Sequence, residues 1–557
     1  MKSHLLAACL LLAAPLCFSQ HITAVHLQVD LNEDKGPLKP MWAWFGYDEP
    51  NYTYMKDGKK LLSELAALSP VPVYVRAHNL MTSGDGTPAL KWGSTGMYRE
   101  DSDGKPVYDW TIVDRIFDTY VERGMKPLAQ IGFMPEALSA HPQPYQHRWA
   151  PGTPYPEIMT GWAYPPNDYK KWSELIYQWV RHSVARYGQA EVESWYWELW
   201  NEPDGFYLIA PNVEQEYFKM YDHAADAVKR ALPTARMGGP HTAHGGKFFD
   251  HFIQHCLNDT NHATGEKGAP IDFLAYHAKG RPTVVNGVVQ MSMKTHFKNI
   301  DDGLAIVASY PQLKGVPVII GESDPEGCAA CGMSTNPENA YRNGTMYASY
   351  TAASIAREYD LATARGVHLA GVVNWSFEFE DQPWFAGFRD LATNGVDKPV
   401  LNVFRMLGMM TGNRVGVTGD GAYDAAAILQ SGVLGERTDI NALAARSAKG
   451  ATVLLWNYHD NDIIDAGSPV RVTIKGIPAS KVVMTHYRID QDHSNAYAAW
   501  KKMGSPARPS PAQIAALEKT GKLATMGAPR TLAVRDRQVV VTMQLPRQAV
   551  SFLKLSY

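Results

Sequence analysis

The stretch NDYKKWSELIYQWVRHSVARYG at residues 167–188, followed by VESWYWELW at 192–200, decides the fold of this chain. The first segment carries apolar residues at intervals of three and four, which is the spacing of an amphipathic helix. The second is a short run rich in aromatic residues, as expected of a buried strand. A helix that leads into a buried strand is the repeating unit of an α/β fold with a parallel sheet.

The same alternation continues on both sides, from about residue 40 to 410. Short apolar runs mark the strands that we expect at residues 41–46, 71–76, 126–133, 192–200, 235–240, 271–276, 316–322 and 367–375. Eight strands joined by helix-like links predict an α/β fold of the (β/α)₈ TIM-barrel type, with a catalytic domain at 37–410. Several links are long, and such loops collect at the C-terminal rim, where barrel enzymes keep their sites.

After residue 410 the sequence changes to alternating runs such as ATVLLWNYH and RQVVVTMQL. This pattern predicts an accessory C-terminal β-sandwich domain at 411–557, with a helical insertion near 511–523. The N-terminal run ITAVHLQVDL also alternates with period two, and we expect residues 21–36 to add a strand to the sandwich.

Composition argues against charged partners. The net charge is -3 and charged residues make up 20% of the 557 residues, so neither nucleic acid nor an anionic membrane is an expected partner. The aromatic content of 11% suits stacking on sugars, although aromatic residues also fill cores. A homo-oligomer is compatible with the sequence.

The N-terminus has the pattern of an export signal. A lysine near the start precedes an apolar run at 5–16 and small or neutral residues at Cys17 and Ser19, which predicts a signal peptide at 1–20. No later run of about 20 apolar residues follows, so we expect a secreted or periplasmic protein without a membrane anchor once the signal is removed.

Loss of the signal peptide would leave three cysteines, Cys256, Cys328 and Cys331. In an oxidising compartment the stretch CAAC at 328–331 is typical of a local disulfide, with Cys256 free. A long-range bridge to Cys256 and a redox pair remain alternatives. Three cysteines without matching histidine spacing make a poor zinc site, and we expect neither a metal nor another cofactor.

The strongest chemical signal is WELWNEPD at 197–204, at the end of the fourth expected strand. Glycoside hydrolysis needs a carboxylic acid with a raised pKa to protonate the leaving oxygen. Glu202, between tryptophan and proline residues at a strand end, suits this role because desolvation disfavours its charged form. Asn201 could donate a hydrogen bond to the sugar 2-hydroxyl.

A second carboxylate follows the seventh expected strand, in VIIGESD at 318–324. Glu322 alone is a weak signal, since a glutamate there is as often an ion-pair partner or a helix cap. The ends of strands 4 and 7 face each other across a barrel mouth. The two glutamates can therefore lie about 5 to 5.5 Å apart, which is the separation found in retaining glycosidases. Glu322 is then the nucleophile.

These phrases, together with YVRAHNL at 74–80, IGFMPEALS at 131–139, DFLAYH at 272–277 and NWSFEFED at 374–381, resemble glycoside hydrolase family 39. Its members include β-xylosidases and α-L-iduronidases. The resemblance implies Glu202 as acid/base and Glu322 as nucleophile, with Arg76 holding a catalytic carboxylate. It also implies sugar contacts from His78, Asn201, Phe206, His277, Trp375, Glu380 and Asp381. Each of these also has a purely structural interpretation, such as a structural histidine at His78 and His277, a core residue at Trp375 or a solvated acidic loop at Glu380 and Asp381.

Two departures from the family pattern concern specificity. The loop after Trp375 is about two residues shorter than the xylosidase-like form, which makes the register of Glu380 and Asp381 uncertain. Lys279 stands where a tyrosine commonly follows the histidine of strand 6 by two residues. Its ammonium could select a uronic acid carboxylate or pair with an acid at the rim, and we favour the pairing.

The two glutamates thus predict a retaining hydrolase. The resemblance implies that it acts on terminal glycosides of plant-type oligosaccharides, with β-1,4-xylosides as the first choice of substrate. An α-L-arabinosidase or an α-L-iduronidase-like enzyme is the alternative within the same mechanism. A carbohydrate-binding barrel without turnover and a polysaccharide lyase are alternatives of other classes, and the presence of both glutamates argues against the first.

Overall fold

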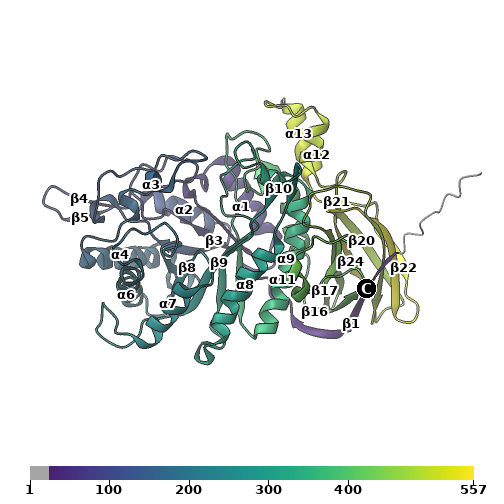
Figure 1. Ribbon diagram of the computed structural model, residues 1–557, viewed down its shortest axis with the longest axis horizontal. Coiled ribbons are helices and arrows are strands. Elements are labelled where there is room, and N and C mark those ends of the chain that lie inside the picture. Colours follow the sequence, from purple (N-terminus) through teal and green to yellow (C-terminus); the bar gives the residue numbers. More distant parts are fainter. Residues whose placement is uncertain (1–23) are drawn as a thin grey trace, which may run out of the picture.

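The computed structural model describes residues 24–557, and its main feature is a closed barrel of eight parallel strands (Figure 1). The predicted signal peptide at 1–20 lies outside the described residues. In chain order the barrel strands are β2 (Trp44–Tyr47), β3 (Tyr74–Ala77), β6 (Lys126–Ile131), β7 (Tyr196–Leu199), β8 (Arg236–Thr242), β9 (Phe273–Lys279), β12 (Val318–Asp324) and β13 (Leu369–Asn374). Each overlaps one of the apolar runs in the sequence, and the predicted barrel is confirmed.

One long helix follows each barrel strand and covers the outside of the barrel. These helices are α1 (Lys56–Leu68), α2 (Thr111–Val121), α4 (Tyr169–Tyr187), α6 (Val213–Ala231), α7 (Lys247–Asn258), α8 (Met293–Ala308), α9 (Thr345–Arg365) and α10 (Pro399–Gly408). The side chain of Asp168 caps the start of α4 by accepting from two backbone N–H groups, and α9 ends at Gly366 in the left-handed conformation. The stripe of α4 that the sequence marks as apolar is buried against the barrel.

The C-terminal region forms one ten-stranded sheet. Its strands are β1 (Val25–Pro37), β16 (Asn413–Gly419), β17 (Asp439–Ser447), β18 (Gly450–Tyr458), β19 (Ser468–Lys475), β20 (Lys481–Ile489), β21 (Ala524–Thr525), β22 (Arg530–Ala533), β23 (Gln538–Leu545) and β24 (Val550–Ser556). The N-terminal strand β1 lies between β16, to which it is antiparallel, and β19, to which it is parallel. Residues near both ends of the sheet share one buried cluster, so the sheet curls around its own core in the manner of a sandwich.

The sheet packs on the barrel through α9. Side chains from β18 and β24, including Trp456 and Phe552, belong to the same buried cluster as the barrel. A buried ion pair joins Arg357 of α9 to Asp439 of β17 at 2.7 Å. Because this contact is apolar and contains a paired charge, it holds the two regions side by side as Figure 1 shows.

The helical insertion of the sheet contains two helices, α12 (Ala496–Lys502) and α13 (Pro511–Gly521). The sequence predicted only the second, which begins with a capping box formed by Ser510 and Gln513. The two helices project from the sheet, at the top of Figure 1, and Trp500 packs on Phe385 in the loop after β13. The insertion therefore supports the loop that follows β13.

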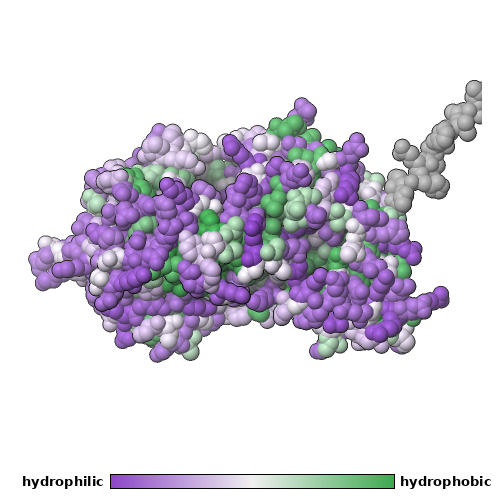
Figure 2. Space-filling view, turned by 60° about the horizontal axis from the view of Figure 1, so that its bottom comes forward, coloured by the Kyte–Doolittle hydropathy of each residue, from purple (hydrophilic) through white to green (hydrophobic). Residues whose placement is uncertain are grey.

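Among residues 24–557, no helix combines the length and apolar character needed to cross a membrane. The face shown in Figure 2 is covered mostly by hydrophilic residues, with smaller hydrophobic areas near its middle.

Candidate active site

A cavity of about 830 Å³ opens at the C-terminal ends of the barrel strands, where enzymes of this fold carry out their chemistry. Of the residues that the sequence singled out, it is lined by His78, Asn201, Glu202, Phe206, Lys279, Glu322, Cys328, Cys331 and Trp375. The barrel thus gathers side chains that are up to about 300 residues apart in the sequence, as the strand order alone requires.

Glu202 lies in the turn that follows β7. Trp200 and Glu202 both have positive φ angles, of 65° and 40°, which L-residues adopt at a cost of order 1 kcal/mol or more. The backbone N–H of Glu202 donates to the carbonyl of His241 at 2.9 Å, which holds the strained turn in place. The side chain keeps 15% of its surface exposed to the cavity. Burial, together with the nearby charge of Glu322, raises the pKa of Glu202 to about 7.

Glu322 is part of β12, and its side chain is only 6% exposed. Arg76 Nη1 donates to Glu322 Oε1 at 3.0 Å, and Lys279 Nζ donates to Glu322 Oε2 at 2.6 Å. Burial alone would raise the pKa of this carboxyl group, but the two cations outweigh it and lower the pKa below its usual value. Glu322 is therefore a carboxylate at the pH at which Glu202 is still half protonated.

His277 connects the two glutamates. Its Nδ1 lies 2.8 Å from Glu202 Oε1, in a hydrogen bond, and 3.7 Å from Glu322 Oε1. The ring is fully buried, and burial lowers the pKa of His277 well below its usual value, so the imidazole is neutral. The resemblance predicted a sugar contact here. That contact stays a prediction, because the ring hydrogen-bonds to Glu202 but is not among the side chains that line the cavity.

Within the described part of the chain, Glu202, His277 and Glu322 are also the one group whose spacing could hold a metal ion, with ligand atoms within 4.8 Å of one another. The cations Arg76 and Lys279 already contact Glu322, and a further cation at this place would be repelled. The group suits paired carboxylate chemistry better than metal binding.

Arg76 is completely buried beneath the cavity floor. Its Nε donates to Glu198 Oε1 at 2.8 Å and its Nη2 to Asn201 Oδ1 at 2.9 Å, in addition to the contact with Glu322. Since the amide oxygen of Asn201 is occupied, its N–H₂ group is left to donate toward the cavity. Glu198, which also pairs with His241, was missed by the sequence analysis. Its position within the strand YWEL is the signal that could have found it.

A second buried chain of polar groups extends from Glu322 to the other side of the mouth. His78 Nδ1 lies 2.8 Å from Asp48 Oδ1, and Lys91 Nζ donates to Asp48 Oδ2 at 2.6 Å. The Trp375 ring lies beside His78, with centroids 4.5 Å apart. Asp48 and Lys91 were missed, although Asp48 directly follows β2 and strand ends are where such residues collect.

Comparison with known proteins agrees with this geometry. The family model described as glycosyl hydrolases family 39 matches residues 25–537. This chain belongs to that family. A β-xylosidase of Geobacillus stearothermophilus is 27% identical over 78% of this chain and 77% of its own length, and an α-L-iduronidase of Mus musculus is 25% identical over 90% and 76%.

Solved structures share the fold of this family 39 hydrolase. A monomeric β-xylosidase from Caulobacter crescentus CB15 superposes with a TM-score of 0.72 at 22% identity, covering 96% of this chain and 99% of that one. A GH39 enzyme from Xanthomonas axonopodis pv. citri gives 0.73 at 22% identity, covering 98% and 99%. Membership of the family makes the chain a glycoside hydrolase that cleaves O-glycosyl bonds.

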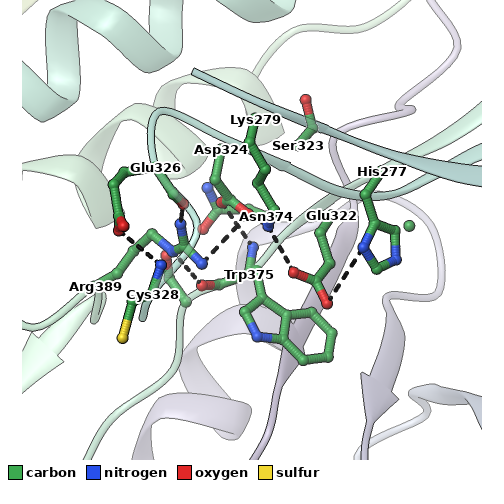
Figure 3. Close-up of polar contacts among 12 residues, drawn as sticks. His277, Lys279, Glu322, Ser323, Asp324, Glu326, Cys328, Asn374, Trp375 and Arg389 are labelled. Carbon is green, nitrogen blue, oxygen red and sulfur yellow. Dashed lines mark hydrogen bonds and ion pairs between the residues drawn. The ribbon is translucent and has the colours of Figure 1, made fainter. Parts of the chain in front are cut away.

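In this family 39 hydrolase Lys279 pairs with acids, as we favoured, but not with acids at the rim. Its Nζ donates to Glu322 Oε2 and, at 2.9 Å, to Asp324 Oδ2 (Figure 3). Asp324 is itself buried, and its Oδ1 accepts the backbone N–H of Trp375 at 3.1 Å. Lys279 therefore acts on the charge of Glu322 directly and connects it to the last barrel strand.

Replacing Lys279 with methionine should move the acidic limb of the kcat/KM profile to higher pH. Without the ammonium group, burial dominates and the pKa of Glu322 rises, so the reactive carboxylate is lost at a higher pH as the solution is acidified. The measurement is the pH profile of kcat/KM on an activated aryl glycoside. Lys314→Met, at an exposed lysine, serves as control. An acidic limb that stays in place in a folded K279M enzyme would show that Lys279 does not set this pKa.

Glu380 and Asp381, predicted to contact sugar, lie away from the cavity. Glu380 Oε2 accepts the backbone N–H of Asp57 at 2.9 Å, in the first turn of α1, where a negative charge is stabilised by the unpaired N–H groups. The backbone N–H of Asp381 donates to Asn394 Oδ1 at 3.0 Å, and its side chain is exposed. The loop after Trp375 places Glu380 against α1, and the two sugar contacts stay predictions.

Cys328 and Cys331 form a disulfide, and Cys256 is free and buried. Both half-cystines are half-buried and line the cavity in the loop after β12. Arg342 and Asn339 donate to the carbonyl of Cys331 at 3.1 and 2.9 Å, so the loop is anchored to the segment that precedes α9. The disulfide thus belongs to one wall of the site.

Proposed function

We propose that this family 39 hydrolase is a retaining β-xylosidase that removes terminal xylose units by double displacement. The observation that carries the proposal is the pairing of Glu202 and Glu322, whose carboxylate oxygens approach within 4.8 Å. Retaining glycosidases hold their carboxyl groups about 5 to 5.5 Å apart, whereas inverting enzymes need about 6.5 to 9.5 Å to admit a water molecule. The β-xylosidase relatives support the choice of sugar.

In the first step Glu322 attacks the anomeric carbon while Glu202 transfers its proton to the departing oxygen, so the glycosidic C–O bond breaks as a glycosyl ester forms. In the second step Glu202, now a carboxylate, accepts a proton from water, and the water oxygen displaces Glu322. Opposite pKa shifts in the two glutamates give each its starting form. The neutral imidazole of His277 can hydrogen-bond to Glu202 in either form without changing its own charge.

Proton NMR of a digest should show the β-anomer of xylose as the first product, before mutarotation. A panel of nitrophenyl glycosides, containing β-xyloside, α-L-arabinoside and α-L-iduronide, tests the sugar in the same experiment. The α-anomer as first product would reject double displacement, and turnover confined to another sugar would reject the xylosidase assignment.

A second candidate, an α-L-iduronidase-like activity, is favoured by Lys279. Its ammonium group lines the cavity beside Glu322, where it could also pair with the carboxylate of a uronic acid. The α-L-iduronidase of Mus musculus matches 90% of this chain. Three results together would favour this candidate: the wild-type enzyme hydrolyses the iduronide, the Lys279→Met variant does not, and neither enzyme hydrolyses the xyloside.

We also propose that the protein is exported and acts in the periplasm or outside the cell, on the basis of the signal-like pattern at residues 1–20.

A further inference from the structure

The cavity continues past the two glutamates into a region that we call the outer chamber. It is lined by the loop at 147–158 together with Trp92 and Phe206, and by the loop at 326–336 that contains the disulfide. The whole cavity, at about 830 Å³, is near the upper end of the range for sites that enclose drug-sized ligands. A single sugar over Glu202 and Glu322 leaves the outer chamber for the leaving group.

One wall of the outer chamber is built from stacked aromatic rings. The Tyr155 ring lies 3.9 Å from Phe206 at an interplanar angle of 25°, and Phe206 lies 4.2 Å from Tyr207, which lines the same cavity as Glu202. Tyr155 is 54% exposed at the outer end of this stack of rings, so about half of its surface faces solvent. Trp149 lines the same loop and is only half-buried. Exposed aromatic rings in a cavity are suited to stack on a ligand.

The polar side chains of the outer chamber hydrogen-bond to their own loops. Thr335 Oγ1 donates to the carbonyl of Gly332 at 3.2 Å, and Thr153 Oγ1 donates to that of Ala150 at 2.7 Å. Asn336 Nδ2 donates to Glu338 Oε1 at 3.1 Å. A sugar ring carries hydroxyl groups around its edge, and on entering they would exchange hydrogen bonds with water for those of side chains that are already partly engaged. An apolar ring incurs no such penalty.

The charged groups near the outer chamber are neutralised as well. Glu326 forms an ion pair with Arg342, and Lys91 pairs with Asp48. His147 stacks on Trp92 with centroids 5.0 Å apart, and burial lowers the pKa of His147 to about 4, so the ring is uncharged at neutral pH. The chamber is therefore matched to an uncharged, flat and largely apolar group.

We propose that the outer chamber binds an aromatic leaving group, so that the preferred substrates are glycosides of aromatic alcohols or phenols rather than oligosaccharides. The inference rests on the proposed function, since it concerns the group that Glu202 protonates. The ring stacks against Tyr155 and Trp149, in a chamber that the disulfide Cys328–Cys331 also lines.

The test compares benzyl β-xyloside, methyl β-xyloside and β-1,4-xylobiose on the full-length enzyme. Benzyl alcohol and methanol are similar leaving groups chemically, so a difference between their glycosides reports binding of the ring. We expect the highest kcat/KM on the benzyl xyloside. The double variant Trp149→Ala, Tyr155→Ala should lower that value by about tenfold, as expected for the loss of two aromatic contacts, and bring kcat/KM on the benzyl xyloside close to that on the methyl xyloside. Tyr164→Ala, in the same region but outside the cavity, is the matched control.

Equal kcat/KM on the benzyl and methyl xylosides would overturn the inference. So would a preference for xylobiose that the double variant abolishes, because the chamber would then hold a sugar. Xylosyl fluoride distinguishes a wrong leaving-group inference from a wrong proposed function, because the fluoride ion departs without a proton from Glu202 and without an aromatic contact. If the fluoride is hydrolysed without a benzyl preference, the proposed function stands and the aromatic leaving group is rejected. If neither the fluoride nor any xyloside reacts, both are rejected.

Discussion

Replacement of Glu322 by glycine should reduce kcat/KM on aryl glycosides by roughly 10⁴-fold or more, the order seen when a catalytic nucleophile is removed. Arg76 and Lys279 keep the carboxylate of Glu322 ionised. No other acidic residue of strand β12 lines the cavity, so no neighbour in that strand can replace Glu322 as nucleophile. Without it, the covalent step cannot occur and only the slow direct attack of water remains.

Azide makes the Glu322 experiment specific. The space left by the carboxylate admits azide, which should attack the anomeric carbon of an activated aryl glycoside and restore turnover, with a glycosyl azide of inverted configuration as product. Glu380→Gln is the matched control, because Glu380 was also predicted to contact sugar but lies against α1. The activity of this variant should remain near that of the wild type. Full activity of E322G, or the absence of a glycosyl azide, would show that Glu322 is not the nucleophile.

The sequence was sufficient to predict the barrel, because the barrel strands are buried on both faces and stand out as apolar runs between amphipathic helices. Counting those runs correctly placed Glu322 opposite Glu202. The same reasoning missed α12, since AYAAWKK is only seven residues long and its stability depends on Trp500 packing against Phe385 in another part of the chain. Local patterns carry no information about such a contact.

The sequence predicted the two glutamates better than their surroundings. Motif and strand position identify a residue at the cavity, but they do not show which way a side chain turns. The His277 side chain hydrogen-bonds to Glu202 from strand β9, and the Glu380 side chain turns to the N-terminus of α1. Asp48, Lys91 and Glu198 act through pairing across the barrel, which only the folded chain shows. Their sequence neighbourhoods resemble those of ordinary ion-pair residues.

Replacement of Glu202 by alanine should produce a loss that depends on the leaving group. General acid catalysis contributes typically 10²- to 10⁴-fold, and this contribution is needed only when the departing oxygen is poorly stabilised. We therefore expect kcat/KM to fall within that range on a benzyl or methyl xyloside, and far less on a dinitrophenyl xyloside. Equal losses on all three substrates would exclude Glu202 as the acid. The glutamine variant, which keeps the side-chain volume, should behave like the alanine variant.

The pH profile supplies an independent measurement of the same role. Because Glu202 must be protonated in the first step and its pKa is raised to about 7, wild-type kcat/KM should fall as the pH rises through 7. The acidic limb belongs to Glu322, whose pKa is lowered, and should lie well below that point. In Glu202→Ala the alkaline limb should disappear while the acidic limb stays.

Azide tests the Glu202→Ala variant in a second way. It should accelerate the second step and yield a glycosyl azide of retained configuration, opposite to that from E322G, because in E202A the azide displaces Glu322 from the glycosyl ester. The same configuration from both variants would contradict the assignment of separate roles to the two glutamates.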